Sequence, residues 1–142
     1  MEFFDVLVRY EVSLWNAVDD ALKREGDLSA AHLQALDVVH RFAGAGRVQD
    51  VSSQIGITVG AASKTVDRLE KDGLVERRPN PADRRSSVIV LTDTGASAYR
   101  GGVSIRARVF ENVLEPEAVK TATEALMALQ SRLDLVATEV PA

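Results

Sequence analysis

The sequence predicts a mainly α-helical protein with a small two- to three-stranded β wing: a winged helix-turn-helix whose two termini form a helical dimerisation region. Three observations predict this fold. Two short helical segments meet at the tight joint 56–58, two strand-like segments at 74–78 and 88–91 follow them, and long amphipathic segments occupy both ends of the chain. A helix-turn-helix followed by a two-stranded ribbon defines the winged form.

Two amphipathic helices are predicted before residue 44. Residues 3–24 carry apolar side chains at the 3.6-residue period of a helix, and Gly26 ends this segment. Ser29 is placed to N-cap a second helix, which Gly44 and Gly46 end. The apolar positions of the two helices are Phe4, Val8, Trp15, Val18, Leu22, Leu33, Leu36, Val39 and Phe42.

The helix-turn-helix and its wing follow. Residues 49–55 predict the first short helix, Thr58 is placed to N-cap the second over 59–72, and Gly73 stands where a C-terminal glycine belongs. Residues 74–78 alternate as a strand, the prolines around Asn80 predict a turn that extends to Asp83, and the β-branched run 88–91 predicts a returning strand.

The C-terminal third predicts two more helices. One begins at Thr92 or Asp93 and extends to about residue 114, although its three glycines each cost about 1 kcal/mol relative to alanine. Pro116 suits the first turn of the last helix. That helix carries a seam that requires a partner helix, and we expect the partner to be a second copy of the chain. The seam consists of Ala122, Leu126, Leu129, Leu133, Val136 and Val140.

Length and composition limit the function. The chain has 142 residues, 46% of them apolar and 27% charged, which fits one soluble globular domain. The absence of cysteine excludes disulfides, thiolate metal sites and iron–sulfur clusters, and no catalytic motif is visible. We therefore expect no catalytic residues, no metal and no cofactor. Without a signal peptide or a long apolar stretch, a cytoplasmic protein with no membrane partner is expected.

The net charge of −4 is unevenly distributed. Residues 47–85 contain eight Lys and Arg against six Asp and Glu, a net charge of +2, whereas the rest of the chain carries −6. A basic middle segment between acidic ends is typical of a local binding footprint for nucleic acid, although a solvated charged surface would give the same counts.

The second short helix suits the major groove of DNA. The apolar residues Ala62, Val66 and Leu69 lie on one face, which predicts that Gly60 and Lys64 point away from it with Ser63 and Arg68 on the flanks. Small residues near the start let a helix approach the bases closely, and arginine can bond O6 and N7 of guanine together. Thr58 offers a hydroxyl group to a phosphate.

The wing tip adds a second basic group. Arg84 and Arg85 suit the negative potential of a narrow A·T-rich minor groove. Asp83 is expected to accept hydrogen bonds from the guanidinium of Arg85 and to orient it. A turn-stabilising ion pair without a role in DNA binding is the alternative interpretation.

Three stretches carry a family resemblance. Residues 64–77 (KTVDRLEKDGLVER), 79–85 (PNPADRR) and 91–95 (LTDTG) resemble the motifs of the MarR family of bacterial transcriptional regulators. The resemblance implies one domain over 1–142, with a dimerisation region at 1–26 and 93–142 and a DNA-binding lobe at 28–92. It also implies a homodimeric repressor of a pseudo-palindromic operator in double-stranded DNA, released by a small aromatic or phenolic effector.

The site residues follow from these arguments. DNA contacts are expected from Thr58, Gly60, Ser63, Lys64, Thr65, Arg68, Asp83, Arg84 and Arg85. Candidate ligand contacts, implied by the resemblance alone, are Tyr10, Trp15, His32 and His40. Dimer contacts are expected from Phe4, Val8, Leu126, Leu129, Leu133 and Val136. Two alternatives stay open: a winged-helix module used for protein–protein contact without DNA, and a MarR-type activator that lacks a small-molecule effector.

Overall fold

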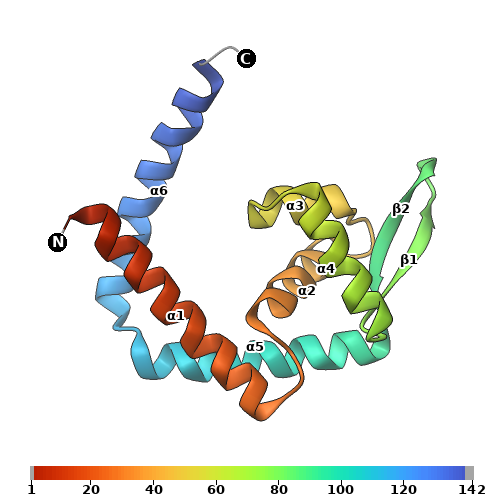
Figure 1. The fold of residues 1–142 in the computed structure, drawn as a ribbon, viewed down its shortest axis with the longest axis horizontal. Coiled ribbons are helices and arrows are strands. Elements are labelled where there is room, and N and C mark those ends of the chain that lie inside the picture. The colour runs from red at the N-terminus through yellow and green to blue at the C-terminus, as the bar shows by residue number, and fades with distance from the viewer. Residues whose placement is uncertain (1, 140–142) are drawn as a thin grey trace. The chain divides into compact units, whose positions relative to one another are not determined.

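The computed structural model describes residues 2–139, and side chains through residue 137. It confirms the predicted winged helix-turn-helix (Figure 1). The elements are α1 (Phe3–Glu25), α2 (Ala30–Arg41), α3 (Val48–Ile55), α4 (Val59–Lys71), β1 (Val75–Asn80), β2 (Asp83–Leu91), α5 (Asp93–Val113) and α6 (Pro116–Glu139). The chain divides into two compact units, Met1–Val109 and Phe110–Ala142.

The junction of α1 and α2 is held by a side chain that the amphipathic pattern did not single out. The Oδ1 atom of Asp19 accepts a 2.8 Å hydrogen bond from the backbone N–H of Ala30, the first residue of α2. The hydroxyl of Ser29 accepts from the N–H of His32 at 3.1 Å, as its N-cap position predicts. Bonds from Lys23 and from Ala30 lower the pKa of Asp19 below its usual value. The start of α2 is thus anchored to α1.

The core of the first unit is built from apolar residues of α1 to α4 and the hairpin. Its largest fully buried side chains are Leu22, Leu33, Leu36, Leu69, Ile89, Val38, Val39, Val51, Val66 and Val75. Only the C-terminal part of α1 takes part, through Val18, Ala21 and Leu22. Nearer its start, α1 exposes Phe4 and Trp15, which the helical period had placed on the same apolar face.

The wing is longer than the sequence predicts. β1 and β2 pair antiparallel from Val75 opposite Leu91 to Asn80 opposite Asp83, with an irregularity between Pro79 and Asn80. Residues 83–87, which precede the predicted strand 88–91, also belong to β2. These polar residues do not show the β-branched pattern of a strand, and they become one because β2 pairs with the neighbouring strand β1. The N–H of Ile89 also donates to the carbonyl of Gly46 at 2.7 Å, so the segment before α3 adds a single bridge to the two strands.

Two of the three glycines in α5 are required by packing. A Cβ atom at Gly95 would lie 1.7 Å from the carbonyl oxygen of Leu74, and one at Gly102 would lie 2.7 Å from Cδ1 of Leu33. A Cβ atom at Gly101 would meet nothing within 4 Å. The helix-propensity cost that the sequence predicts is therefore offset at Gly95 and Gly102 by a close approach that only glycine permits.

The second unit contains α6. The carboxylate of Glu115 accepts from the backbone N–H of Ala118 at 2.7 Å, and Pro116 is the first residue of the helix, as predicted. The side chains of the seam from Ala122 to Val136 are exposed in the single chain, and Val140 lies outside the described residues. No helix in the described part of the chain is long and apolar enough to cross a bilayer.

Candidate nucleic-acid interface

The rear face of α4 is completely buried. The hydroxyl of Thr58 caps the helix by accepting from the N–H of Ala61 at 3.2 Å. Ala62, Val66 and Leu69 are each 0% exposed, so the predicted apolar face is confirmed. After the last turn, Gly73 adopts a φ of 73° and the N–H of Leu74 returns to the carbonyl of Leu69 at 2.9 Å. Burial on one side and caps at both ends hold α4 in a fixed orientation.

The outward face of α4 carries the predicted polar residues. Gly60, Lys64 and Arg68 are exposed, whereas Ser63 and Thr65 are half-buried. No atom lies within 4 Å of the Cβ position of Gly60, so the backbone there is open to a close approach. The hydroxyl of Thr65 donates to the carbonyl of Ala61 at 3.1 Å. It therefore keeps its lone pairs for an incoming donor.

The wing tip is organised by hydrogen bonds to its backbone. Oδ1 of Asp83 accepts from the backbone N–H of Arg85 at 2.9 Å, and Oδ1 of Asn80 accepts from the N–H of Ala82 at 3.0 Å. The carboxylate of Asp83, which was expected to bond the guanidinium of Arg85, instead accepts from the main chain. Within residues 2–139, neither Arg84 nor Arg85 forms a side-chain hydrogen bond or ion pair. Both charges are thus exposed for a partner.

Hydrogen bonds join the wing to α4 through Arg77, Asp67 and Glu70, which we call the Arg77 bracket. The guanidinium of Arg77 on β1 donates to Oδ1 of Asp67 at 2.6 Å and to Oε2 of Glu70 at 2.5 Å. The backbone N–H of Arg77 also donates to Oε1 of Glu70 at 3.0 Å. Sequence reasoning missed this bracket. The signal that could have found it is a pair of acids three positions apart on one helix, followed by an arginine on the next strand.

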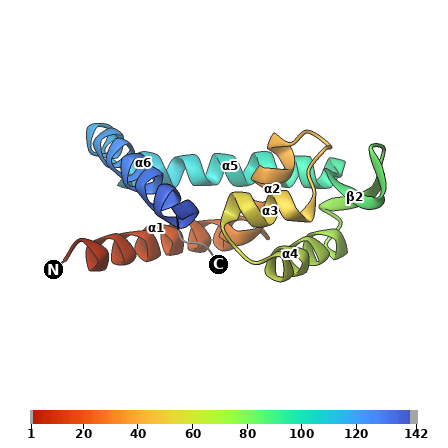
Figure 2. The same ribbon diagram turned by 90° about the horizontal axis from the view of Figure 1, so that it is seen from above.

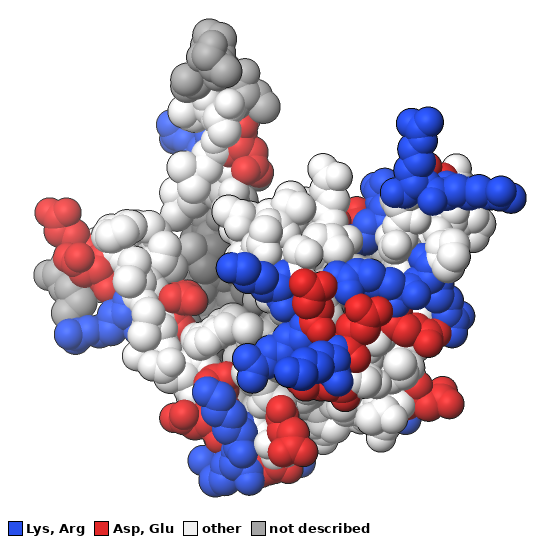
Figure 3. Space-filling model, turned by 45° about the vertical axis from the view of Figure 1, so that its right-hand side comes forward, with Lys and Arg blue, Asp and Glu red and all other residues white. Residues whose placement is uncertain are grey.

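Basic side chains stand out from the hairpin. Seen from above, α4 and the hairpin lie at the same end of the first unit (Figure 2). Lys and Arg side chains project from the hairpin at the upper right of Figure 3, while acidic and basic side chains alternate over the surface below it. The positive charge is therefore local, in agreement with the uneven distribution along the sequence.

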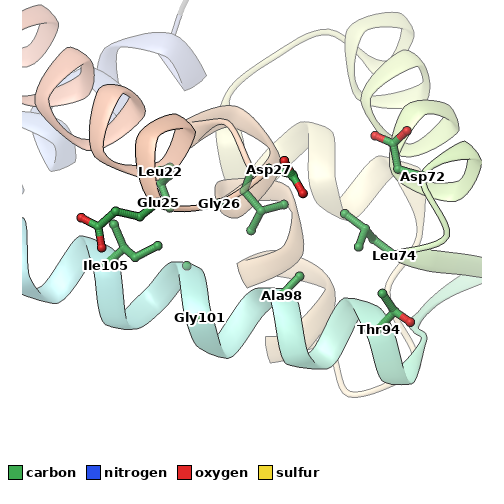
Figure 4. Close-up of a pocket in the computed structure, with 12 residues that line it drawn as sticks. Leu22, Glu25, Gly26, Asp27, Asp72, Leu74, Thr94, Ala98, Gly101 and Ile105 are labelled. Atoms are coloured by element: carbon green, nitrogen blue, oxygen red, sulfur yellow. The ribbon is translucent and has the colours of Figure 1, made fainter.

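A cavity of about 590 Å³ lies elsewhere in the first unit. Figure 4 shows it between the end of α1 and α5, with the end of α4 at one side. Its lining consists of Leu22, Glu25, Gly26, Asp27, Leu28, Asp72, Leu74, Thr94, Ala98, Gly101, Gly102 and Ile105. Its volume is within the range of about 300–1,000 Å³ that is usual for small-molecule sites.

The four candidate ligand residues lie outside this lining. Tyr10 and Trp15 are exposed on α1, in the part of the helix that the core does not cover. Burial lowers the pKa of His32, which favours its neutral form. His40 stacks on Tyr99 of α5 with ring centroids 4.5 Å apart. Among the described residues, no group of His, Cys, Asp and Glu is placed to hold a metal ion.

Comparison with known proteins shows which family and which solved structures the chain resembles. The model of the MarR family matches residues 26–86, which contain the helix-turn-helix and the wing tip. Over these residues the chain is similar to the MarR family. The uncharacterized HTH-type transcriptional regulator YfiV from Bacillus subtilis (strain 168) is 28% identical over 111 residues, which are 76% of this chain and 69% of that protein. The chain therefore resembles MarR-family proteins in the segment that contains the helix-turn-helix and the wing tip.

Two solved structures show the same fold. CouR from Rhodococcus jostii RHA1, bound to p-coumaroyl-CoA, is similar with a TM-score of 0.78 and 23% identity over 87% of this chain and 88% of that one. A mutant of MarR from E. coli, complexed with operator DNA, is similar with a TM-score of 0.76 and 23% identity over 88% of this chain and 91% of that one. At these identities the likeness establishes the fold.

Proposed function

We propose that this chain is a transcriptional regulator of the MarR type, a homodimeric repressor that binds a pseudo-palindromic operator and is released by a small ligand. One observation carries the proposal: α4 is buried along its whole rear face and turns Lys64 and Arg68 outward. A helix held in this way can enter the major groove, which is about 12 Å wide, without leaving its support.

The two basic surfaces divide the work of recognition. Lys64 and Arg68 reach base edges or phosphates from α4, and Arg85 enters the adjoining minor groove from the wing tip. The expected supporting contacts are those of Thr58, Gly60, Ser63, Thr65, Asp83 and Arg84. In this assignment Asp83 shapes the tip backbone, as its bond to the N–H of Arg85 supports.

Two uncovered apolar helices support the proposed dimer. Phe4 on α1 is 72% exposed and Leu133 on α6 is 65% exposed, and monomeric proteins rarely leave such side chains in contiguous stripes. We assign residues 1–26 and 93–142 to the dimerisation region and 28–92 to the DNA-binding lobe. The contacts assigned to the interface are Phe4, Val8, Leu126, Leu129, Leu133 and Val136.

The proposal that this chain represses transcription and is released by a ligand is supported by what is known of similar proteins. CouR is described as a transcriptional repressor and has been solved on a 23-mer DNA duplex, and it also binds p-coumaroyl-CoA. BpsR from Bordetella bronchiseptica is regulated in its DNA binding by 6-hydroxynicotinic acid. We propose the same kind of regulation, DNA binding controlled by a small ligand, for the present chain. A ligand that favours one lobe arrangement lowers operator affinity by its differential affinity for the two states.

Binding-site selection from random duplexes tests DNA recognition. The selected duplex is then titrated by fluorescence anisotropy over a range of salt concentrations, and a steep fall in log K with log salt is expected. Lys64→Ala combined with Arg68→Ala is expected to lose sequence preference while the protein stays folded. Arg24→Ala combined with Arg100→Ala removes the same charge from exposed positions on α1 and α5 and is the matched control. No duplex binding at low salt would favour the protein–protein module.

Sedimentation equilibrium tests the dimer. Leu133→Asp is expected to yield monomers or unfolded chains, because the charge falls within the apolar seam of α6. Thr123→Asp, on an exposed part of the same helix outside the seam, is expected to remain dimeric. A folded dimer of Leu133→Asp would move the interface elsewhere.

A further inference from the structure

Val59, the first residue of α4, is an apolar residue that the fold leaves exposed. Its side chain is 54% exposed, whereas every other Val, Leu, Ile, Phe and Tyr side chain of the described residues 16–112 is buried or half-buried. The remaining exposed large apolar side chains lie on α1, at the end of α5 and on α6, in the proposed dimerisation region. The proposed dimer therefore does not account for the exposure of Val59.

The residues that follow Val59 are small and uncharged. Gly60 and Ala61 are exposed, and nothing lies within 4 Å of the Cβ position of Gly60. The hydroxyl of Thr58 accepts from the N–H of Ala61 at 3.2 Å, which fixes the first turn of the helix. We call residues 59–61 the uncharged end of α4. A partner can approach this end closely, because none of its three residues carries a long side chain.

The uncompensated charges further along α4 are positive. Lys64, Arg68 and Lys71 are exposed, and none of them forms an ion pair with another of the residues 2–139. The acids of the helix are occupied, because they belong to the Arg77 bracket. A helix with uncompensated positive charge suits a polyanion, which is the electrostatic character of a nucleic acid.

DNA offers one apolar group to such a helix. In the major groove the edges of the base pairs present hydrogen-bond donors and acceptors, and thymine adds an apolar substituent, its 5-methyl group. The N-terminal residues of a recognition helix are those that contact base edges. The position of Val59 and the chemistry of its side chain therefore both fit the methyl group of thymine.

We propose that Val59 is a specificity residue of α4 and that it contacts the 5-methyl group of a thymine in each half of the operator. This inference rests on the proposed function and adds to it a preference for thymine at one position of each half-site. The contact removes the methyl group and the side chain of Val59 from water. Burial of one methyl group strengthens binding by about fourfold.

Replacement of thymine by deoxyuridine isolates the methyl group. Uracil pairs with adenine as thymine does and presents the same acceptor in the major groove, but it lacks the 5-methyl group. Each thymine of the duplex obtained by binding-site selection is replaced in turn, and fluorescence anisotropy with the full chain measures the affinity. We expect a loss of about fourfold at one position of a half-site and a larger loss when both half-sites carry the replacement. Thymines outside the half-sites serve as internal controls.

Val59→Ala identifies the side chain that reads the methyl group. Because the side chain is exposed, the variant is expected to keep the thermal stability of the wild type. It is expected to bind the unmodified operator at least about fourfold more weakly, and to bind the thymine and uracil duplexes equally at the decisive position. Val59→Thr keeps the β-branched shape and one methyl group, and is expected to retain part of the preference.

Lys64→Ala is the matched control on the same helix. It is expected to weaken binding to the thymine and uracil duplexes alike and to leave the ratio of the two affinities unchanged, because it removes a charge and not the apolar contact.

Two results would overturn the inference and leave the proposed function intact. One is a wild-type protein that binds every deoxyuridine duplex as tightly as the unmodified operator. The other is a folded Val59→Ala variant that retains the full preference for thymine at every position. If no duplex is bound even at low salt, the proposed function fails together with this inference, and the protein–protein module is favoured.

Discussion

Arg77 on β1 donates a 2.6 Å hydrogen bond to Asp67 on α4, and this bond ties the wing to the helix that faces DNA in our proposal. Glu70, one turn further along α4, accepts from both the side chain and the backbone of Arg77. The two surfaces that read DNA in the proposal are thus held in a fixed relationship by charge-assisted bonds.

Arg77→Ala is expected to weaken operator binding by about 1 kcal/mol, or roughly fivefold, because the wing is no longer fixed against α4. Its effect on the free energy of unfolding is expected to stay within about 1 kcal/mol, since the acids are largely exposed. Anisotropy and chemical denaturation measure the two quantities. Arg78→Ala removes the same charge from the same strand, and an equal loss there would show that charge alone is responsible.

The wing tip gives a prediction that separates two roles of Asp83. Asp83→Ala removes the acceptor for the N–H of Arg85 and is expected to weaken operator binding, as is Arg85→Ala. Asp83→Asn keeps an acceptor oxygen and is expected to bind nearly as the wild type does. If Asp83→Asn is as impaired as Asp83→Ala in the same anisotropy assay, the negative charge matters and the backbone role is insufficient.

Gly95→Ala is expected to destabilise the fold by about 1–3 kcal/mol, because its methyl group would overlap the carbonyl of Leu74. Gly101→Ala on the same helix is expected to stabilise it by up to about 1 kcal/mol, since nothing opposes the new methyl group. Chemical denaturation measures both. Equal effects of the two substitutions would mean that helix propensity, and not packing, governs α5.

Asp19 gives a prediction that depends on pH. Asp19→Ala is expected to lower the free energy of unfolding by about 0.5–2 kcal/mol, which is the usual cost of removing a helix cap, because the N–H of Ala30 loses its acceptor. The pKa of Asp19 is lower in the folded protein than its ordinary value of 3.8, because the bonds from Lys23 and from Ala30 stabilise the carboxylate. Its ionic contribution is therefore complete above that value and is lost as the pH falls through the folded-state pKa.

Asp19→Asn is the control for this pH dependence, because an amide oxygen still accepts from Ala30 but does not titrate. The stability difference between the wild type and Asp19→Asn is expected to shrink as the pH falls below about 4. Denaturation curves across that range measure it. A difference that stays constant in acid would exclude the carboxylate as the titrating group.

The sequence predicts the helices well because burial and caps act locally. Thr58, Gly73 and the apolar face of α4 follow from spacing and residue type, and the structure confirms all three. The length of the wing does not follow from the sequence, because residues 83–87 are polar and become part of a strand through the pairing of β2 with β1. Long-range pairing of this kind leaves little trace in a local pattern.

The candidate site is predicted in part for the same reason. Exposure of Lys64 and Arg68 follows from the helical period, whereas the bracket of Arg77 joins residues seven and ten positions apart on different elements. The cavity depends on the end of α1, the loop after it, and α5, which lie far apart in the sequence. No sequence periodicity predicts that Glu25, Asp27 and Asp72 line the same cavity.

The contact between Gly95 and Leu74 has a consequence for the study of related chains. A homologue with any larger residue at the position of Gly95 has to hold the beginning of α5 further from the residue that precedes β1. The size of the amino acid at this position therefore indicates how closely α5 approaches the start of β1. Related sequences can be divided by this residue into those that allow the close approach and those that do not.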